Sequence, residues 1–208
     1  TVGVFSGGVG IRWFDFTVTG MEAHACPTPM ALRKDALLAA TRIMQYVVSA
    51  AHRHPPHGRG TVGMVQVFPN SRNVIPGRVK FSIDLRNSTD ELVDAMAAEV
   101  KAFADQVAKE HGVQVHIEMV SSYPAQLFQP ECVEAVGRAA AKLGYSHMPA
   151  VSGAGHDAVY MAKLAPSGMI FIPCKDGISH NEIEDAKPEH IEAGCNVLLH
   201  AMLERAGT

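Results

Sequence analysis

Strand-like and helix-like spacings of apolar residues follow one another in a definite order over the first 120 residues, and this order restricts the possible folds. Alternating or apolar-rich runs between turn signals predict strands at 11–19, 61–68, 79–85 and 113–119. Spacings of three and four residues predict one helix at 34–52 and a second that begins at Ser88 or Thr89 and ends before Gly112. The predicted order is β-α-β-β-α-β.

This order is the split βαβ or ferredoxin-like arrangement, in which two helices cover one face of an antiparallel sheet. We therefore predict an α/β fold with a small ferredoxin-like domain at 10–121. The helix faces that pack on the sheet are predicted from the apolar residues at helical spacing, namely Leu37, Leu38, Met44, Val47, Val48 and Ala51, then Leu92, Met96, Val100, Phe103 and Val107.

The remaining residues, 122–208, predict a different kind of structure. They contain a helix between Pro130 and Gly144, a short buried strand "GMIFIP", and a final helix after Pro188. Three short elements without an obvious closed sheet indicate the C-terminal segment of a larger α/β domain. Residues 1–9 are strand-like from the first positions and lack a starting methionine. We expect them to end a preceding segment of that domain, with an N-terminal portion of the natural protein missing.

Charge and cysteine content limit the partners that we expect. The net charge of -3 comes from mixed signs without long blocks, which does not provide the basic surface that nucleic acid or an anionic membrane requires. The four cysteines are widely spaced, as is typical of reduced thiols, and no apolar run approaches the ~20 residues of a membrane span. We predict a cytoplasmic protein that acts on a small molecule.

Three of the eleven histidines occur in settings that suit a functional site. His24 lies in a loop before the first helix. His156 follows Gly153 and Gly155, where the backbone can approach a ligand, and it precedes a helix N-terminus that would favour an anion. The alternative is that Asp157 only caps this helix and that His156 has no role.

His180 follows the carboxyl end of the predicted strand at "GMIFIP", the edge at which open α/β sheets place ligands. Ser179 and Asn181 are candidates to orient its ring, which is what a metal-ligating histidine needs. A catalytic zinc needs about three protein ligands, and the chain has no HxD or HExxH to supply the others. His180 is therefore either structural or one ligand of a site whose other members lie elsewhere.

Four segments carry a resemblance to a known family: "GxxAHAxxTPMxxRxDAL" at 20–37, "NVIPGRVKFSIDLR" at 73–86, "SGAGHDA" at 152–158 and "PCKDGISHNE" at 173–182. In this order they resemble the hydantoinase/carbamoylase amidohydrolases, which include N-carbamoyl-L-amino-acid hydrolases, β-ureidopropionases and allantoate amidohydrolases. The resemblance implies a ferredoxin-like dimerisation (lid) domain inserted into a di-metal α/β aminopeptidase-like catalytic domain, of which this chain has the C-terminal part.

The resemblance also implies roles for particular residues. His24 would reach the active site of the partner subunit in a homodimer and stabilise the oxyanion on the ureido carbonyl. Asn73 and Arg86 would hold the substrate carboxylate, while Gly155 and His156 would orient the substrate. His180 would be the last ligand of two divalent metal ions, which can be zinc, manganese, cobalt or nickel.

The implied reaction is metal-dependent hydrolysis of N-carbamoyl amino acids to the free amino acid, ammonia and carbon dioxide. An allantoate or ureidoglycolate amidohydrolase is the main alternative, and a non-catalytic dimerisation fragment is a second. Peptidase or deacylase activity fits the first motif less well. We expect the chain to be inactive alone, because the other metal ligands and the general base precede the inserted domain in this family. Relatives usually have "AHAGTTPM", so Cys26 and Pro27 are expected to change the loop that carries His24.

Overall fold

The computed structural model describes residues 2–207, which form two compact units. The central unit is Gly10–Ala125, and the split unit combines residues 2–9 with 126–207. None of the helices within 2–207 has both the length and the apolar character that crossing a bilayer requires. The two units are described in turn.

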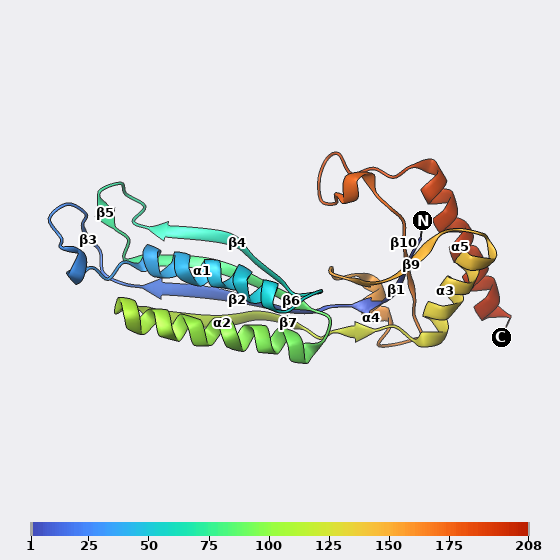
Figure 1. Cartoon of the computed structure of the whole chain (residues 1–208), viewed down its shortest axis with the longest axis horizontal. Helices are drawn as coiled ribbons and strands as arrows, with labels where there is room; N and C mark the ends of the chain where they lie inside the picture. The colour runs from blue at the N-terminus through green and yellow to red at the C-terminus, as the bar shows by residue number, and fades with distance from the viewer. Residues whose placement is uncertain (1, 208) are drawn as a thin grey trace. The chain divides into compact units, whose positions relative to one another are not determined.

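The central unit contains a four-stranded antiparallel sheet with two helices on one face (Figure 1). Its main elements are β2 (Gly10–Thr19), α1 (Ala36–Arg53), β4 (Arg59–Phe68), β6 (Arg78–Asn87), α2 (Asp90–His111) and β7 (Gln114–Tyr123). The strands lie in the order β4-β6-β2-β7, so each helix connects two strands that are not neighbours in the sheet. The β-α-β-β-α-β order is the one predicted, although β7 continues to Tyr123 rather than ending at Met119.

Strict alternation in β6 places one row of side chains in the core. Val79, Phe81, Ile83 and Leu85 are almost fully buried, and β2 contributes Phe16, whose ring stacks on that of Phe81 at 5.2 Å. Polar residues of β6 project from the opposite face of the sheet because successive side chains of a strand point to opposite sides.

The predicted face of α1 was partly wrong. Leu38 and Val48 are 48% and 45% exposed. The residues of α1 that pack on the sheet are instead Ala36, Ala39, Ala40, Ile43, Val47, Ala50 and Ala51. These small side chains let the helix lie close to β4, where a Cβ on Gly60 would come within 2.6 Å of the Val47 carbonyl oxygen. In α2, similarly, Val93 is buried and Leu92 is exposed.

Local signals set the ends of the helices, and those of α2 are the ones predicted. Asp35 accepts hydrogen bonds from the backbone of Leu37 and Leu38 at the start of α1, and Thr89 caps α2 by accepting from Leu92. Gly112 ends α2 with a left-handed φ of 60°, a conformation that glycine adopts without steric cost.

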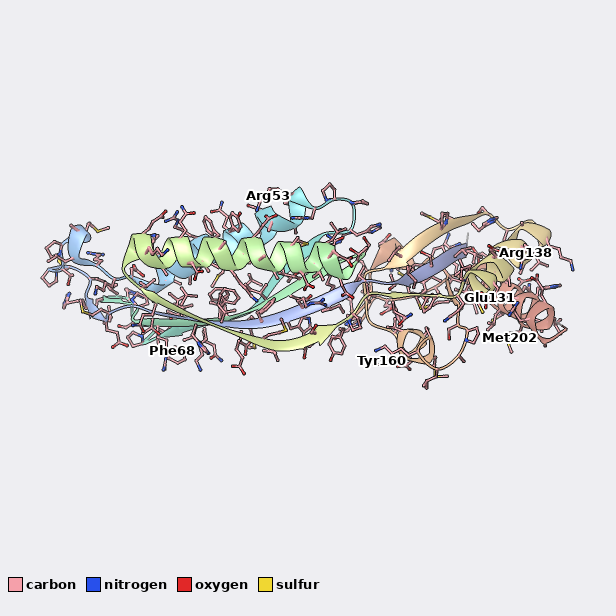
Figure 2. All side chains as sticks on the ribbon, turned by 90° about the horizontal axis from the view of Figure 1, so that it is seen from below. Arg53, Phe68, Glu131, Arg138, Tyr160 and Met202 are labelled. Carbon is pink, nitrogen blue, oxygen red and sulfur yellow. The ribbon has the colours of Figure 1, made fainter. Side chains whose placement is uncertain are left out.

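The two helices of the central unit are joined by side chains on their shared boundary. The rings of Tyr46 and Phe103 stack at 3.9 Å, and Arg53, labelled in Figure 2, donates a 2.8 Å hydrogen bond to Glu99. Hydrogen bonds from Arg53 and His54 lower the pKa of the Glu99 carboxyl group. α1 and α2 therefore form one continuous layer.

A buried arginine stabilises the end of the central sheet near the start of β2. Arg12 is 6% exposed and donates to Asp94 at 2.8 Å and to Asp90 at 3.0 Å, as well as to two backbone carbonyls. Burial acts to lower the pKa of Arg12, but the bonds to Asp94 and Asp90 outweigh it and raise that pKa. Asp90 also accepts from the Ala125 backbone, so this cluster joins β2, α2 and the last residue of the unit.

The split unit has a sheet that was not predicted. β1 (Val2–Gly8) lies at its centre, parallel to β9 (His147–Ser152) on one side and antiparallel to β10 (Met169–Phe171) and β8 (Gln126–Leu127) on the other. The sequence analysis did not identify β8 and β9 as strands, so it did not predict this sheet. β1, which is distant in the sequence, forms the centre of this sheet. β10 is half-buried, whereas a buried strand was predicted.

Helices α3 (Pro130–Lys142) and α5 (Pro188–Ala206) pack on this sheet and on each other. Both begin with proline at the first turn, as predicted. Arg138, labelled in Figure 2, donates to Glu204 at 2.6 Å and so bridges α3 and α5. The short helix α4 (Asp157–Met161) follows β9.

Candidate active site

His24 lies at the tip of the central unit, in a loop whose conformation its own side chain helps to set. The backbone N–H of Cys26 donates to Nδ1 of His24 at 3.1 Å. Since a backbone N–H can only donate, Nδ1 is the acceptor and the neutral ring carries its proton on Nε2. His24 is exposed, so this Nε2–H is available to a ligand. The contact uses the backbone of Cys26, and a cysteine in place of glycine therefore preserves it.

Arg33 holds the rest of this loop in place. Its guanidinium donates to the carbonyl of Ala25 at 2.6 Å and to that of Thr28 at 3.0 and 3.1 Å. The hydroxyl of Thr28 in turn donates to the His24 carbonyl at 2.7 Å. A planar guanidinium presents several donors in a fixed fork, so one side chain can fix two carbonyls at once. Thr28 and Arg33 therefore position the loop around His24.

We expect Arg33→Lys to loosen this loop, because an ammonium group cannot reproduce the forked contacts to Ala25 and Thr28. Hydrogen exchange should increase by about tenfold over residues 24–33, in line with the loss of ~1.4 kcal/mol of hydrogen bonding. Arg59→Lys is the matched control, because Arg59 also donates to two local carbonyls but lies on β4. Unchanged exchange in Arg33→Lys would contradict this role.

The base of the His24 loop lies against the segment that carries Asn73. β3 (Ala23–His24) pairs with β5 (Val74–Ile75), and Ala25 donates to the Asn73 carbonyl at 2.9 Å. The side-chain oxygen of Asn73 accepts from the Ser71 hydroxyl at 3.0 Å, and the residue is exposed. The structure thus brings two of the predicted site residues together although they are far apart in the sequence.

Arg86 lies near the end of β6 and is half-buried. It forms a forked ion pair with Asp84, with Nε 2.9 Å from Oδ1 and a terminal nitrogen 2.6 Å from Oδ2. These hydrogen bonds raise the pKa of the Arg86 guanidinium, although burial acts in the opposite direction. A ligand carboxylate that binds Arg86 must therefore share this guanidinium with Asp84.

The glycine-containing turn belongs to the split unit. Nε2 of His156 lies 2.6 Å from the Ser152 hydroxyl, and the ring meets the ring of Phe171 edge-on at 5.2 Å. His156 itself is the residue before α4 and makes no capping hydrogen bond with its side chain. Asp157 is the first helical residue rather than the N-cap, so the alternative in which Asp157 caps this helix is not found. With only five residues, α4 also gives no support to the predicted anion site at a helix N-terminus.

His180 lies in the loop between β10 and α5, exposed and with a positive φ of 57°. Its backbone N–H donates to Glu184 at 3.1 Å, while Asn181 accepts from the Ile183 backbone. Among the described residues, no side chain bonds the imidazole, so the predicted orientation by Ser179 and Asn181 is not found. A left-handed backbone at a non-glycine residue costs of order 1 kcal/mol or more and is common at functional sites.

The described part of the chain does not by itself fit a complete metal site. No cluster of three or more histidine, cysteine or carboxylate side chains occurs within 2–207. His180 offers one imidazole, whereas a catalytic site of this type needs about three protein ligands. All four cysteines are free.

The two-unit α/β architecture and its motifs place the chain in a known class of hydrolases. Residues 21–204 match the model of Peptidase family M20/M25/M40, and the chain belongs to this family. The predicted resemblance is confirmed, because solved structures that the chain resembles are amidases of the hydantoinase/carbamoylase family. One of them, from Burkholderia multivorans, has a TM-score of 0.95 and 52% sequence identity, covering 99% of this chain and 50% of that one.

Two relatives with named activities extend the comparison. The N-carbamoyl-L-amino-acid amidohydrolase of Rhizobium meliloti is 46% identical over 205 residues, which are 99% of this chain and 49% of the relative. The allantoate amidohydrolase of Bacillus subtilis is 30% identical over 205 residues, with 99% and 50% covered. The chain therefore spans about half the length of the relatives that it matches.

Three residues that contribute to the geometry were not identified from the sequence. Arg33 and Asp84 lie inside the quoted motifs, but their partners become known only from the fold. Ser152 begins "SGAGHDA", and its position four residues before His156 gave no reason to expect contact between them. A motif identifies which residues matter without showing which of them touch.

Proposed function

We propose that the protein from which this chain comes hydrolyses the ureido amide bond of N-carbamoyl amino acids, releasing the free amino acid, ammonia and carbon dioxide. The observation that carries this proposal is 46% identity over 205 residues to an enzyme named for that activity. The chemistry of two residues also supports it. Arg86 suits a substrate carboxylate, and His24 offers an exposed hydrogen-bond donor.

In this proposal Asn73 and Arg86 bind the carboxylate of the substrate. A guanidinium pairs two carboxylate oxygens at once, and the contact fixes the orientation of the reacting end. Gly155 and His156 orient the substrate in this proposal. His24 donates from Nε2 to the oxygen on which negative charge develops, a contact that stabilises the transition state more than the ground state.

We also propose that the protein is a homodimer, with the central unit as the dimerisation (lid) domain inserted at about 10–121. β4 supports this proposal because it is an edge strand of the sheet and exposes Met64 and Val65 at 58% and 48%. Edge strands with exposed apolar side chains pair readily with another chain. In a dimer, His24 acts in the site of the partner subunit. We place the enzyme in the cytoplasm, in keeping with its free thiols.

Divalent metal ions complete the proposed site, with zinc, manganese, cobalt and nickel as the candidates. His180 is proposed as one ligand, with the others outside this chain, so that the chain alone is inactive. Its backbone strain and exposure support this role. When bound, such ions supply Lewis-acid activation of water.

The proposal is tested by assaying the full-length protein on a panel of N-carbamoyl-L-amino acids, allantoate, ureidoglycolate and a dipeptide. We expect the highest kcat/KM for a carbamoyl amino acid. Allantoate is the second candidate because of the 30% identity to the Bacillus subtilis enzyme. Faster hydrolysis of allantoate would replace the first activity with the second, and no hydrolysis of any substrate would favour a non-catalytic dimerisation role.

His180→Ala should lower the metal content of the full-length protein from about two ions per chain toward about one, because an imidazole ligand is lost. Elemental analysis after dialysis measures this directly, without any assay of activity. His190→Ala is the matched control, since His190 is a half-buried histidine of α5. Metal content equal to that of the wild type in His180→Ala would remove the assignment.

A further inference from the structure

Ser152 is the last residue of β9, and polar groups surround its side-chain hydroxyl. The residue is 2% exposed, and its Oγ lies 2.6 Å from Nε2 of His156. The backbone nitrogen of Ala154 is 3.2 Å from the same oxygen, and the Ala154 carbonyl is 3.4 Å away. The hydroxyl group thus has three polar neighbours within hydrogen-bonding distance.

The directions of these hydrogen bonds follow from what each group can do. The Ala154 N–H can only donate, so Oγ accepts from it. The hydroxyl proton then has two possible acceptors, and the Ala154 carbonyl lies beyond the usual range of an O–H···O bond, about 2.5–3.0 Å. Because Nε2 of His156 is much closer, at 2.6 Å, we assign the hydroxyl proton to the bond with Nε2. A neutral ring that accepts at Nε2 carries its proton on Nδ1.

The other ring nitrogen of His156, Nδ1, is not fully shielded from solvent. Within 2–207 no protein group bonds Nδ1, and every side-chain nitrogen or oxygen that is shielded from solvent has a hydrogen-bond partner. The edge contact with Phe171 further fixes the plane of the ring. His156 thus presents an Nδ1–H donor outward from a ring held on two sides.

The adjoining glycines leave room for a ligand. A Cβ on Gly153 or Gly155 would meet no atom within 4 Å, and neither residue has a positive φ. At Gly155, therefore, neither packing against the described residues nor a left-handed backbone requires glycine. Close approach by a group from outside the chain provides a reason for it.

We propose that Ser152 is a positioning residue that locks His156 in the Nδ1–H tautomer, so that the ring donates a hydrogen bond to an acceptor oxygen of the substrate at the open side of this turn. The role in catalysis rests on the proposed function, because it takes that oxygen from a carbamoyl amino acid. The tautomer itself does not depend on it. Ser152 acts only through His156 and does not touch the substrate.

Ring-¹⁵N NMR of histidine-labelled full-length protein tests the tautomer at about pH 8.5, where an ordinary imidazole with a pKa of about 6.5 is neutral. His156→Gln identifies the signals of His156 by their loss. We expect the wild-type ring to be protonated at Nδ1, Ser152→Ala to shift the proton to Nε2, and Ser152→Thr to restore it to Nδ1. A wild-type ring protonated at Nε2, or an Nδ1–H tautomer retained in Ser152→Ala, would overturn the proposal.

Kinetics of the same variants tests the role in catalysis. We expect Ser152→Ala to lower kcat/KM for an N-carbamoyl amino acid about tenfold, and Ser152→Thr to recover at least about half of the wild-type value. Ser6→Ala is the control, because Ser6 donates to the Ala150 carbonyl on the same sheet without touching a histidine. Wild-type kcat/KM in Ser152→Ala would overturn the positioning role.

The two measurements separate this inference from the proposed function. A wild-type protein that hydrolyses no carbamoyl amino acid would refute the function, whereas the NMR result would still decide the tautomer. Thermal unfolding of each variant identifies any loss of folding. Should Ser152→Ala fail to fold, Ser152→Thr decides the matter, since loss of the Nδ1–H signal with the hydroxyl retained contradicts the proposal.

Discussion

Arg86→Ala should raise the KM for N-carbamoyl amino acids about hundredfold while changing kcat much less, because a forked carboxylate contact of ~3 kcal/mol is made in the ground state and the transition state alike. Steady-state kinetics of the full-length protein measures both parameters. The control is Arg78→Ala on the same strand, whose guanidinium lies 4.4 Å above the ring of Phe68. We expect the KM of this control to stay within about twofold of the wild-type value.

The pairing of Arg86 with Asp84 requires a second comparison. Removing the arginine leaves a half-buried carboxylate without its partner, which can disturb the site by itself. Arg86→Ala combined with Asp84→Asn removes both charges, so a high KM that persists in this double variant reflects loss of substrate binding. A carbamoyl amino acid amide, which lacks the carboxylate, should show little difference between wild type and Arg86→Ala. Equal KM values for the carboxylate substrate would remove Arg86 from the site.

His24→Ala should lower kcat about hundredfold, since removing one donor to a developing oxyanion costs ~3 kcal/mol. The physical reason is the exposed Nε2–H that the Cys26 contact leaves free to donate. His116→Ala is the matched control, because His116 is an exposed histidine of the same unit on β7. The expected change in this control is less than about twofold.

Mixed dimers test whether His24 acts across subunits. Pairing His24→Ala with a variant that lacks the general base creates one site with both functional groups if each site uses the partner's histidine. Such dimers should regain up to about half of the wild-type activity. Absence of any recovery would show that His24 acts within its own chain.

The central unit was largely predictable because its two inner strands, β2 and β6, each bury one face. Alternation in β6 identified Val79, Phe81, Ile83 and Leu85 as core residues, and all four are buried. Helix ends were equally predictable, since Thr89 and Gly112 act on neighbouring backbone groups. These are local effects, which a reader of the sequence can evaluate without knowing the fold.

The split unit was predictable only in part, because its sheet is assembled from distant segments. β1 pairs with β9 across more than a hundred residues, and nothing within either segment specifies that pairing. The face of α1 was misjudged for a related reason. Apolar size predicted Leu38 and Val48, whereas the close approach of the helix to β4 selected alanine.

The sequence by itself determined the order of the main elements in the central unit, the ends of α2, and the motifs that contain His24, Asn73, Arg86, His156 and His180. Tertiary structure alone decided which groups meet: Arg33 with the His24 loop, Asp84 with Arg86, and Ser152 with His156. Periodicity and capping depend on residues a few positions apart, which the sequence displays directly. Hydrogen-bond partners and ring tautomers depend on distances and directions that exist only once the chain has folded.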